Sequence, residues 1–141
     1  MKFKVENATM KDCTEMYRLS FVSGLANPEG RPPPQSWTES FVREKKYAFI
    51  IKDKGRVIGY LLGERTCGGV GLVWMLGVEK SYRNKGLGSK LLRHTARQMK
   101  KDGAHVVIAY GYTGNPAVKH LLKKLKFHAG NEYIEYVKFL W

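Results

Sequence analysis

The fold is decided by the stretch Leu76–Leu92, which reads LGVEKSYRNKGLGSKLL. An apolar segment typical of a strand comes first, and a basic turn containing Gly86 and Gly88 follows it. The leucines after the turn favour a helix, whose first N–H groups are unpaired and carry partial positive charge. Glycines let the backbone approach phosphate oxygens, and Arg83 and Lys85 add full charges. The stretch therefore predicts an anion-binding turn at the start of a helix.

Two other phosphate-binding loops do not fit this turn. The sequence contains no G-x-x-x-x-G-K-S/T pattern, which a P-loop requires. A dinucleotide-binding fingerprint requires a third glycine where this chain has Leu91. It also follows an early parallel strand rather than a series of antiparallel ones. A glycine pair alone is a weak signal, so a basic turn that binds no ligand is still open at this point.

Outward from this stretch, alternation and periodicity predict the remaining elements. Apolar and polar residues alternate over 2–7, as in an opening strand, and Thr9 with Asp12 fits a capping box. The Pro-rich segment 24–37 excludes helix and central strand. Gly77 lies within an apolar segment, where a bulge or a close backbone approach is expected. The other expected elements are a helix over 9–22, a short helix over 38–46, strands over 47–52, 56–64 and 70–78, a helix over 88–102, a strand over 105–110, a helix opened by Gly114-Asn115-Pro116, and a last strand over 132–141.

The order of these elements predicts an α/β fold with a mixed sheet. Strands 47–52, 56–64 and 70–78 form an antiparallel meander. A strand, a helix and another strand over 70–110 form a βαβ unit, whose crossover is right-handed and whose strands are parallel. Helices then cover both faces of the sheet. The chain of 141 residues fits one domain, 1–141.

Composition narrows the class of protein. The chain has 25 Lys and Arg against 12 Asp and Glu, a net charge of +13, so it attracts anions such as nucleic acid, anionic lipid or a polyphosphate. No apolar run is long enough to span a membrane, and the first residues lack the apolar segment of a signal peptide. Cys13 and Cys67 stand apart and the four histidines are scattered, so we expect a cytoplasmic protein with no metal site.

The full pattern of the stretch resembles the acetyl-CoA signature of the GNAT superfamily of N-acetyltransferases. The core of that signature is R/Q-x-x-G-x-G/A, and Arg83, Gly86 and Gly88 fill it. A second block of the family resembles N-x-x-A-x-x-x-Y-x-x-x-G-F. Asn115 and Phe127 match its ends, at the right separation of twelve. The element order matches as well, so the resemblance covers essentially the whole chain.

The resemblance implies how a cofactor would bind. Backbone N–H groups from Arg83 to Ser89 would hold the diphosphate of acetyl-CoA. The pantetheine arm would pair like an extra strand with residues 76–78, where two parallel strands splay apart. The N–H of Val78 would polarise the thioester carbonyl, and an amine would attack it directly. The cofactor-binding residues expected from the resemblance are Leu76, Gly77, Val78, Arg83, Asn84, Lys85, Gly86, Leu87, Gly88, Ser89 and Asn115.

The resemblance fails at the positions that move protons. The family's usual general acid is a Tyr seven residues after the motif Asn, and Leu122 stands there. Many members carry a Glu five residues before that Asn, and Tyr110 stands there. Tyr110, Tyr112 and Glu64 are the candidate substitutes, although the tyrosines could serve packing and Glu64 could be a solvated carboxylate at a strand end. With Val78, these three complete the expected catalytic set.

The sequence leaves the acceptor open. Trp37 and the segment 24–37 lie where family members build the acceptor wall, and Trp37 could equally cap an edge of the core. Residues Lys119–Lys126 hold a second basic cluster, which could attract an acidic acceptor or RNA or be a plain solvated face. Two hypotheses follow: an N-acetyltransferase acting on a small or protein amine, and a non-catalytic module that senses acyl-CoA or binds nucleic acid. A homodimer paired through the last strand is also open, and no membrane partner is expected.

Overall fold

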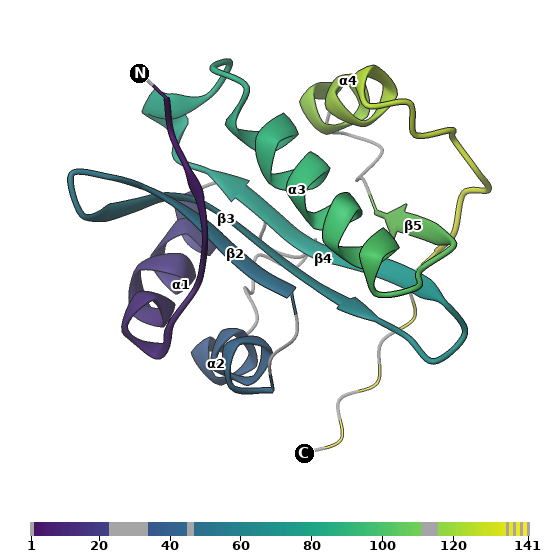
Figure 1. Ribbon diagram of the computed structural model, residues 1–141, viewed down its shortest axis with the longest axis horizontal. Helices are drawn as coiled ribbons and strands as arrows, with labels where there is room; N and C mark the ends of the chain where they lie inside the picture. The colour runs from purple at the N-terminus through teal and green to yellow at the C-terminus, as the bar shows by residue number, and fades with distance from the viewer. Residues whose placement is uncertain are drawn as a thin grey trace. The chain divides into compact units, whose positions relative to one another are not determined.

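The computed structural model describes residues 2–22, 34–44, 47–110 and 116–134, together with residues 136, 138 and 140. Contacts between residues divide the chain into two compact units, Met1–Tyr110 and Gly111–Trp141. The first unit contains a sheet and the helices around it, and the second contains the helix α4 (Pro116–Lys124) (Figure 1). The expectation of one domain over 1–141 stays a prediction.

The first unit is built on a five-stranded sheet in the order β1-β2-β3-β4-β5. Strands β1 to β4 pair with their neighbours antiparallel, and β4 pairs with β5 parallel. The predicted meander and mixed sheet are therefore confirmed. The chain passes from β4 to β5 through α3, as a βαβ unit requires. The bounds are β1 (Val5–Asn7), β2 (Tyr47–Asp53), β3 (Arg56–Arg65), β4 (Val70–Val78), β5 (Val106–Ala109) and α3 (Leu87–Lys101).

The helices differ from the prediction mainly at their ends. A 3₁₀ turn precedes α1 (Cys13–Val22), and α2 (Gln35–Arg43) begins before the predicted Thr38. Pro34 explains the earlier start of α2, because its φ of −66° suits a helix N-terminus, where a missing N–H costs nothing. The predicted proline at the first turn of the last helix is confirmed in α4. The segment predicted as a loop over 24–37 falls largely outside the described residues.

The predicted capping box at Thr9 and Asp12 is present. The Thr9 N–H donates to Asp12 Oδ2 at 2.8 Å, and the Thr9 hydroxyl lies 3.0 Å from the same oxygen. Lys52 on β2 forms an ion pair with Asp12 at 2.8 Å. Burial opposes ionisation of Asp12, but the hydrogen bonds from Lys52 and Thr9 outweigh it and lower the pKa of this carboxyl. The charged side chain therefore fastens the start of α1 to the sheet.

Apolar packing occupies both faces of the sheet, as the sequence predicted. Helix α3 lies across one face, with α1 and α2 on the other (Figure 1). Glycines in β3 and β4 let α3 approach closely, because a Cβ at Gly63 or Gly71 would meet the side chain of Met99 at 3.0 or 2.4 Å. The cluster on the α1 and α2 face consists of Met16, Leu19, Phe41, Ala48, Ile50, Val57, Tyr60, Leu62 and Met75.

Tyr60 carries a polar group into that cluster. The residue is 1% exposed, and within the described part of the chain its hydroxyl has no hydrogen-bond partner. Burial raises the pKa of the phenol, so the group stays neutral. Because an unsatisfied buried donor costs about 1–3 kcal/mol, we expect Tyr60→Phe to raise the free energy of unfolding in urea by about 1 kcal/mol. A less stable variant would mean that the hydroxyl has a partner.

Two predictions about strands need correction. Of the two alternatives expected at Gly77, a bulge or a close backbone approach, the bulge lies instead at Trp74. Met75 faces Leu62 and Val73 faces Gly63, which leaves Trp74 as an extra residue in β4. No strand is assigned to the described residues from 132 onward, where a last strand over 132–141 was predicted. Alternating apolar residues suggested that strand. The described large apolar residues of this segment, such as Tyr136 at 89% exposed, are exposed to solvent.

Candidate active site

The parallel strands β4 and β5 pair along only part of β4. The register joins Val70–Val73 to Val106–Ala109, and β5 ends there. Strand β4 continues to Val78, past the bulge at Trp74, with β3 on one side and no β5 partner on the other. A bulge bends its strand and increases the local twist, which accounts for the separation. Among the described residues of the first unit, the backbone of residues 74–78 therefore forms an open strand edge, as the predicted splay required.

The direction of the backbone groups along this edge follows from one hydrogen bond. The N–H of Glu79 donates to Ile58 O on β3 at 2.8 Å. Because successive N–H groups of a strand point to opposite sides, the N–H of Val78 points away from β3, and so does that of Leu76. Both groups therefore face the open edge. An extended molecule with amide groups could pair with them as a further strand.

The turn between β4 and α3 has the backbone geometry of an anion site. Asn84 and Gly86 have φ of 62° and 79°, and the residue between them does not have positive φ. Alternation of left-handed and right-handed residues points successive N–H groups into one concavity. Gly86 caps α3 without a side-chain hydrogen bond, so side chains leave the first-turn N–H groups of α3 available. The predicted turn and its place at a helix start are confirmed, while the bound anion stays a prediction.

The two basic side chains of the turn, Arg83 and Lys85, make different contacts. Arg83 donates its Nε–H to Val78 O at 3.0 Å, so its guanidinium lies beside the end of β4. The Lys85 ammonium lies 5.2 Å from the ring centroid of Tyr82, in a cation–π contact. Tyr82 donates its hydroxyl to Asp53 at 2.6 Å, and this hydrogen bond raises the pKa of the phenol. Arg83 therefore supports the strand end, and Tyr82 braces the turn against the β2–β3 hairpin.

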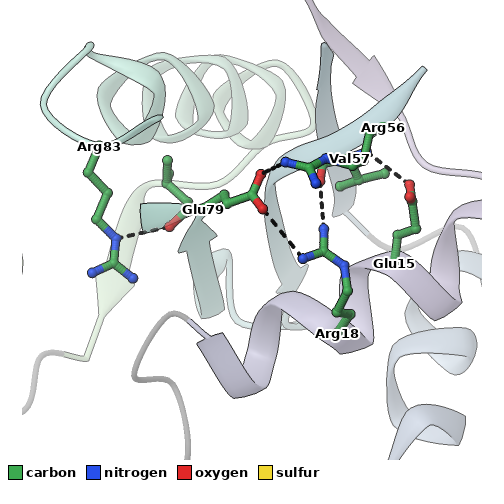
Figure 2. Close-up of polar contacts among 7 residues, drawn as sticks. Glu15, Arg18, Arg56, Val57, Glu79 and Arg83 are labelled. Carbon is green, nitrogen blue, oxygen red and sulfur yellow. Dashed lines mark hydrogen bonds and ion pairs between the residues drawn. The ribbon is translucent and has the colours of Figure 1, made fainter. Parts of the chain in front are cut away.

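Glu79, which the sequence analysis gave no role, anchors the end of β4 (Figure 2). Its carboxylate is bound by Arg56 at 2.6 Å and by Arg18 at 3.5 Å, and its side chain is only 13% exposed. Arg18 also reaches Val57 O at 3.4 Å, while Glu15 accepts the Val57 N–H at 2.9 Å. These contacts tie β4 to β3 and α1 next to Val78. The sequence contained a signal for this role of Glu79, since Glu79 is the one acidic residue in the basic stretch 76–92.

Three predicted residues meet around Trp74, which the sequence analysis had not singled out. The indole N–H of Trp74 donates to Glu64 Oε1 at 3.0 Å. Trp37 of α2 lies edge-to-face with Trp74, with ring centroids 6.3 Å apart, and Trp37 also packs against Phe41. The Tyr110 ring, directly after β5, lies 6.4 Å from that of Trp74. Glu64, Trp37 and Tyr110 thus flank the point where β4 and β5 separate. Trp37 packs against the edge of the core, while its place in an acceptor wall stays a prediction.

The remaining predicted residues belong to the second unit or lie outside the described residues. Tyr112 and Asn115 are not described. Leu122 lies on α4, where it is half-buried. His120 and the lysines of the second basic cluster are exposed on or just after α4: Lys119, Lys123, Lys124 and Lys126. The role of Tyr112 and Asn115 therefore stays a prediction.

Within the described residues, no group of three or more His, Cys, Asp and Glu side chains could hold a metal ion. None of the described helices is both long and apolar enough to cross a bilayer. The open edge of β4 and the turn before α3 are the candidate parts of a binding site.

The family model described as "Acetyltransferase (GNAT) family" matches residues 10–127, which include both. The chain belongs to the GNAT acetyltransferase family. The resemblance in the sequence of the turn is thereby confirmed, and the fold agrees with it. An aminoglycoside N-acetyltransferase solved in complex with CoA is similar in fold, with a TM-score of 0.78, 15% identity, and 97% of this chain and 95% of that chain covered.

Two relatives within the GNAT family are named mycothiol acetyltransferase. The protein from Corynebacterium glutamicum is 32% identical over 66 residues, which are 47% of this chain and 23% of that protein. The protein from Corynebacterium efficiens is 28% identical over 99 residues, which are 70% of this chain and 33% of that protein. The chain thus spans about a quarter to a third of the length of these relatives.

Proposed function

We propose that this GNAT protein is an N-acetyltransferase that transfers the acetyl group of acetyl-CoA directly to an amine. The observation that supports this proposal is that two features of the first unit adjoin each other. The open edge of β4 offers two N–H groups, at Leu76 and Val78, and it runs into a concave turn at the start of α3. An extended thioester with a phosphate group at its far end fits both features together.

The residues present fit acetyl-CoA on physical grounds. The Arg83 N–H already donates to Lys80 O at 3.3 Å, so the N–H groups of residues 84–89, at the start of α3, are the ones that match the diphosphate. Lys85 adds a positive charge beside them. The Leu76 and Val78 N–H groups match the pantetheine amides and the thioester carbonyl. With phosphates at the turn, the thioester end of the molecule would point along β4 toward Trp74. Leu76 lies two residues nearer to Trp74 than Val78 does. Its N–H is then a second donor to the thioester carbonyl, in addition to the predicted N–H of Val78.

The cofactor supplies an activated acetyl group, and this chain's residues supply orientation and proton transfer. The N–H groups of the β4 edge hold the negative charge that develops on the carbonyl oxygen. Glu64 takes the proton from the amine, directly or through one water, because an amine with a pKa of about 10 reaches the site mostly protonated. Tyr110 is the described phenol nearest to the splay and donates a proton to the departing thiolate. That thiolate can also leave unassisted, since its reference pKa is about 8.5.

The acceptor is proposed only as a class. The two Corynebacterium relatives are named for mycothiol, but the chain matches only part of each, so their acceptor is not transferred to it. The net charge of +13 would repel a polycation, which favours a compact amine. Two unpaired cysteines, one buried and one exposed, are consistent with the reducing cytoplasm that we propose as the location.

A panel of amines mixed with acetyl-CoA tests the proposal, with free thiol as the readout. We expect thiol release that depends on the amine, and mass spectrometry of the acceptor should find the acetylated product. The control is acetyl-CoA and protein without amine, which reports hydrolysis alone. If the protein binds acetyl-CoA but no amine in the panel is acetylated, the catalytic proposal fails.

One observation favours the alternative of a non-catalytic module. The lysines of α4 are exposed, and Leu122 cannot donate a proton where most family members have a Tyr. If this cluster serves nucleic acid, the logarithm of the affinity for single-stranded RNA should fall with the logarithm of salt by about 0.7 for each phosphate contacted. Absence of RNA affinity at low salt would leave only a solvated lysine face.

A further inference from the structure

Glu79 stands between the two parts of the proposed cofactor site. The residue before it, Val78, ends β4 and directs its N–H to the open edge. The residues after it form the 3₁₀ turn Lys80–Tyr82, and the Glu79 carbonyl accepts the Tyr82 N–H at 2.9 Å. The turn that contains Gly86 comes next. The backbone of Glu79 therefore joins the proposed carbonyl donor to the proposed phosphate turn.

The peptide group between Val78 and Glu79 is held on both of its edges. Its N–H donates to Ile58 O of β3 at 2.8 Å, and its oxygen, Val78 O, accepts the Arg83 Nε–H at 3.0 Å. The Val78 N–H belongs to the preceding peptide group, so the two backbone torsions of Val78 set its direction relative to this fixed group. A movement of Glu79 would therefore turn or shift the Val78 N–H.

The Glu79 side chain also holds this end of β4 (Figure 2). Arg56 of β3 binds one carboxylate oxygen at 2.6 Å, and Arg18 of α1 lies 3.5 Å from the other. Arg18 is itself fixed to β3, because it donates to Val57 O at 3.4 Å while Glu15 accepts the Val57 N–H at 2.9 Å. The carboxylate is thus held from two elements that are fixed to each other. Because both arginines are partly exposed, water solvates them when the carboxylate is removed, and such pairs contribute modestly to stability.

We propose that Glu79 is a positioning residue, which through Arg18 and Arg56 keeps the Val78 N–H aimed at the thioester carbonyl. The inference rests on the proposed N-acetyltransferase function and adds to it a residue, outside the expected cofactor-binding set, on which the rate depends. A donor held in advance stabilises the charge that develops in the transition state, and binding of the ground state depends on it less. Loss of the Glu79 contacts should therefore lower kcat and leave KM for acetyl-CoA nearly unchanged.

The carbonyl stretching frequency of bound acetyl-CoA reports the position of the donor without any turnover. Isotope-edited infrared spectroscopy gives this frequency for acetyl-CoA labelled at the acetyl carbonyl and bound to the protein without amine. Because the Val78 N–H polarises the carbonyl, we expect a lower frequency than for free acetyl-CoA. Glu79→Gln should move it back toward the free value, since glutamine keeps the size of the side chain but not its charge. Arg56→Lys keeps the charge of the partner and should preserve most of the lowering.

Steady-state kinetics give the second readout. Removing an oxyanion donor costs about 10²–10³-fold in kcat, and misplacing one should cost less, so we expect kcat about tenfold lower in Glu79→Gln. KM for acetyl-CoA should stay within about twofold or fall, since the variant removes a negative charge near the proposed phosphate turn. Adding Arg56→Gln to Glu79→Gln should lower kcat no further, because both changes break the same contact.

Asp12→Asn is the matched control. Asp12 is also a buried carboxylate, directly before α1, and its ion pair with Lys52 at 2.8 Å fastens α1 to β2 rather than to β4. The variant should be less stable in urea, yet keep the wild-type kcat and carbonyl frequency. If Asp12→Asn lowers kcat as much as Glu79→Gln does, the effect is a general loss of packing, and the positioning role is overturned.

The outcomes separate this inference from the function on which it rests. A carbonyl frequency that depends on Glu79 in the expected way, without acetylation of any amine, supports the positioning role and overturns the catalytic proposal. Acetylation of amines with the same kcat and carbonyl frequency in Glu79→Gln as in the wild type leaves the N-acetyltransferase proposal standing and overturns the role of Glu79. A higher KM for acetyl-CoA with unchanged kcat would assign Glu79 to cofactor binding and overturn the positioning role as well.

Discussion

Gly86→Glu should lower the affinity for acetyl-CoA at least about a hundredfold while the protein stays folded. Gly86 has φ of 79°, and among the described residues an added Cβ would meet nothing within 4 Å. The new side chain would therefore start from the turn that the diphosphate is proposed to occupy. Two like charges about 4 Å apart repel by about 4 kcal/mol at an effective dielectric constant of about 20, which corresponds to more than two orders of magnitude in affinity. Calorimetry with acetyl-CoA measures the change.

Gly55 provides a matched control for this variant. It has φ of 78°, and an added Cβ there also meets nothing within 4 Å, but it lies in the turn between β2 and β3. Gly55→Glu should therefore cost a similar stability, about 1–2 kcal/mol for a side chain in the left-handed region, and leave acetyl-CoA affinity unchanged. Equal losses of affinity in both variants would point to a general effect of charge or folding, and the assignment of the turn would fall.

Glu64→Gln should lower kcat by about a hundredfold at neutral pH, the lower end of what general acid–base catalysis contributes. Glutamine keeps a carbonyl oxygen that can accept the Trp74 N–H, now 3.0 Å from Glu64 Oε1, so the aromatic cluster stays in place. The variant lacks a group that takes a proton from the amine. Its rate should then rise about tenfold per pH unit up to the pKa of the amine, about 10, as more amine is deprotonated in solution. A pH profile of kcat/KM for the amine measures this.

The control for Glu64 is Glu6→Gln, a change of the same kind at the exposed edge strand β1. It should leave both the rate and the pH profile unaltered. If Glu64→Gln keeps the wild-type rate at neutral pH, Glu64 is not the base. A rate that falls equally at every pH would instead indicate that Glu64 positions Trp74 and the acceptor without moving a proton.

The sequence predicted the parts of this molecule that depend on neighbouring residues. The stretch from Leu76 to Leu92 contains the end of a strand, a turn and the start of a helix, so the turn at the helix start could be inferred without knowledge of the rest. The capping box at Thr9 and Asp12 is local in the same way. The turn before α3 is therefore predictable from one continuous segment, and the family signature lies in that segment.

The features that could not be predicted depend on pairing across the sheet. The bulge at Trp74 is a property of the register between β3 and β4, and nothing in the sequence of β4 distinguishes Trp74 from Gly77 as its site. The contacts of Glu79 involve Arg18 and Arg56, which are far away in the chain. The last strand was predicted from alternation alone, which cannot tell whether a neighbouring strand is available. The prediction from the sequence for the residues around Trp74 was accordingly incomplete.

Transfer of a labelled acetyl group tests the central claim most directly. Acetyl-CoA with an isotope-labelled acetyl carbonyl is mixed with the protein and one equivalent of an amine that it acetylates, and NMR follows the label over a single turnover. We predict that the label passes from the thioester to the amide of the acceptor, that none is found on the protein, and that Gly86→Glu does not transfer it. Label that becomes covalently attached to the protein, or transfer that Gly86→Glu supports at the wild-type rate, would contradict direct transfer at the edge of β4.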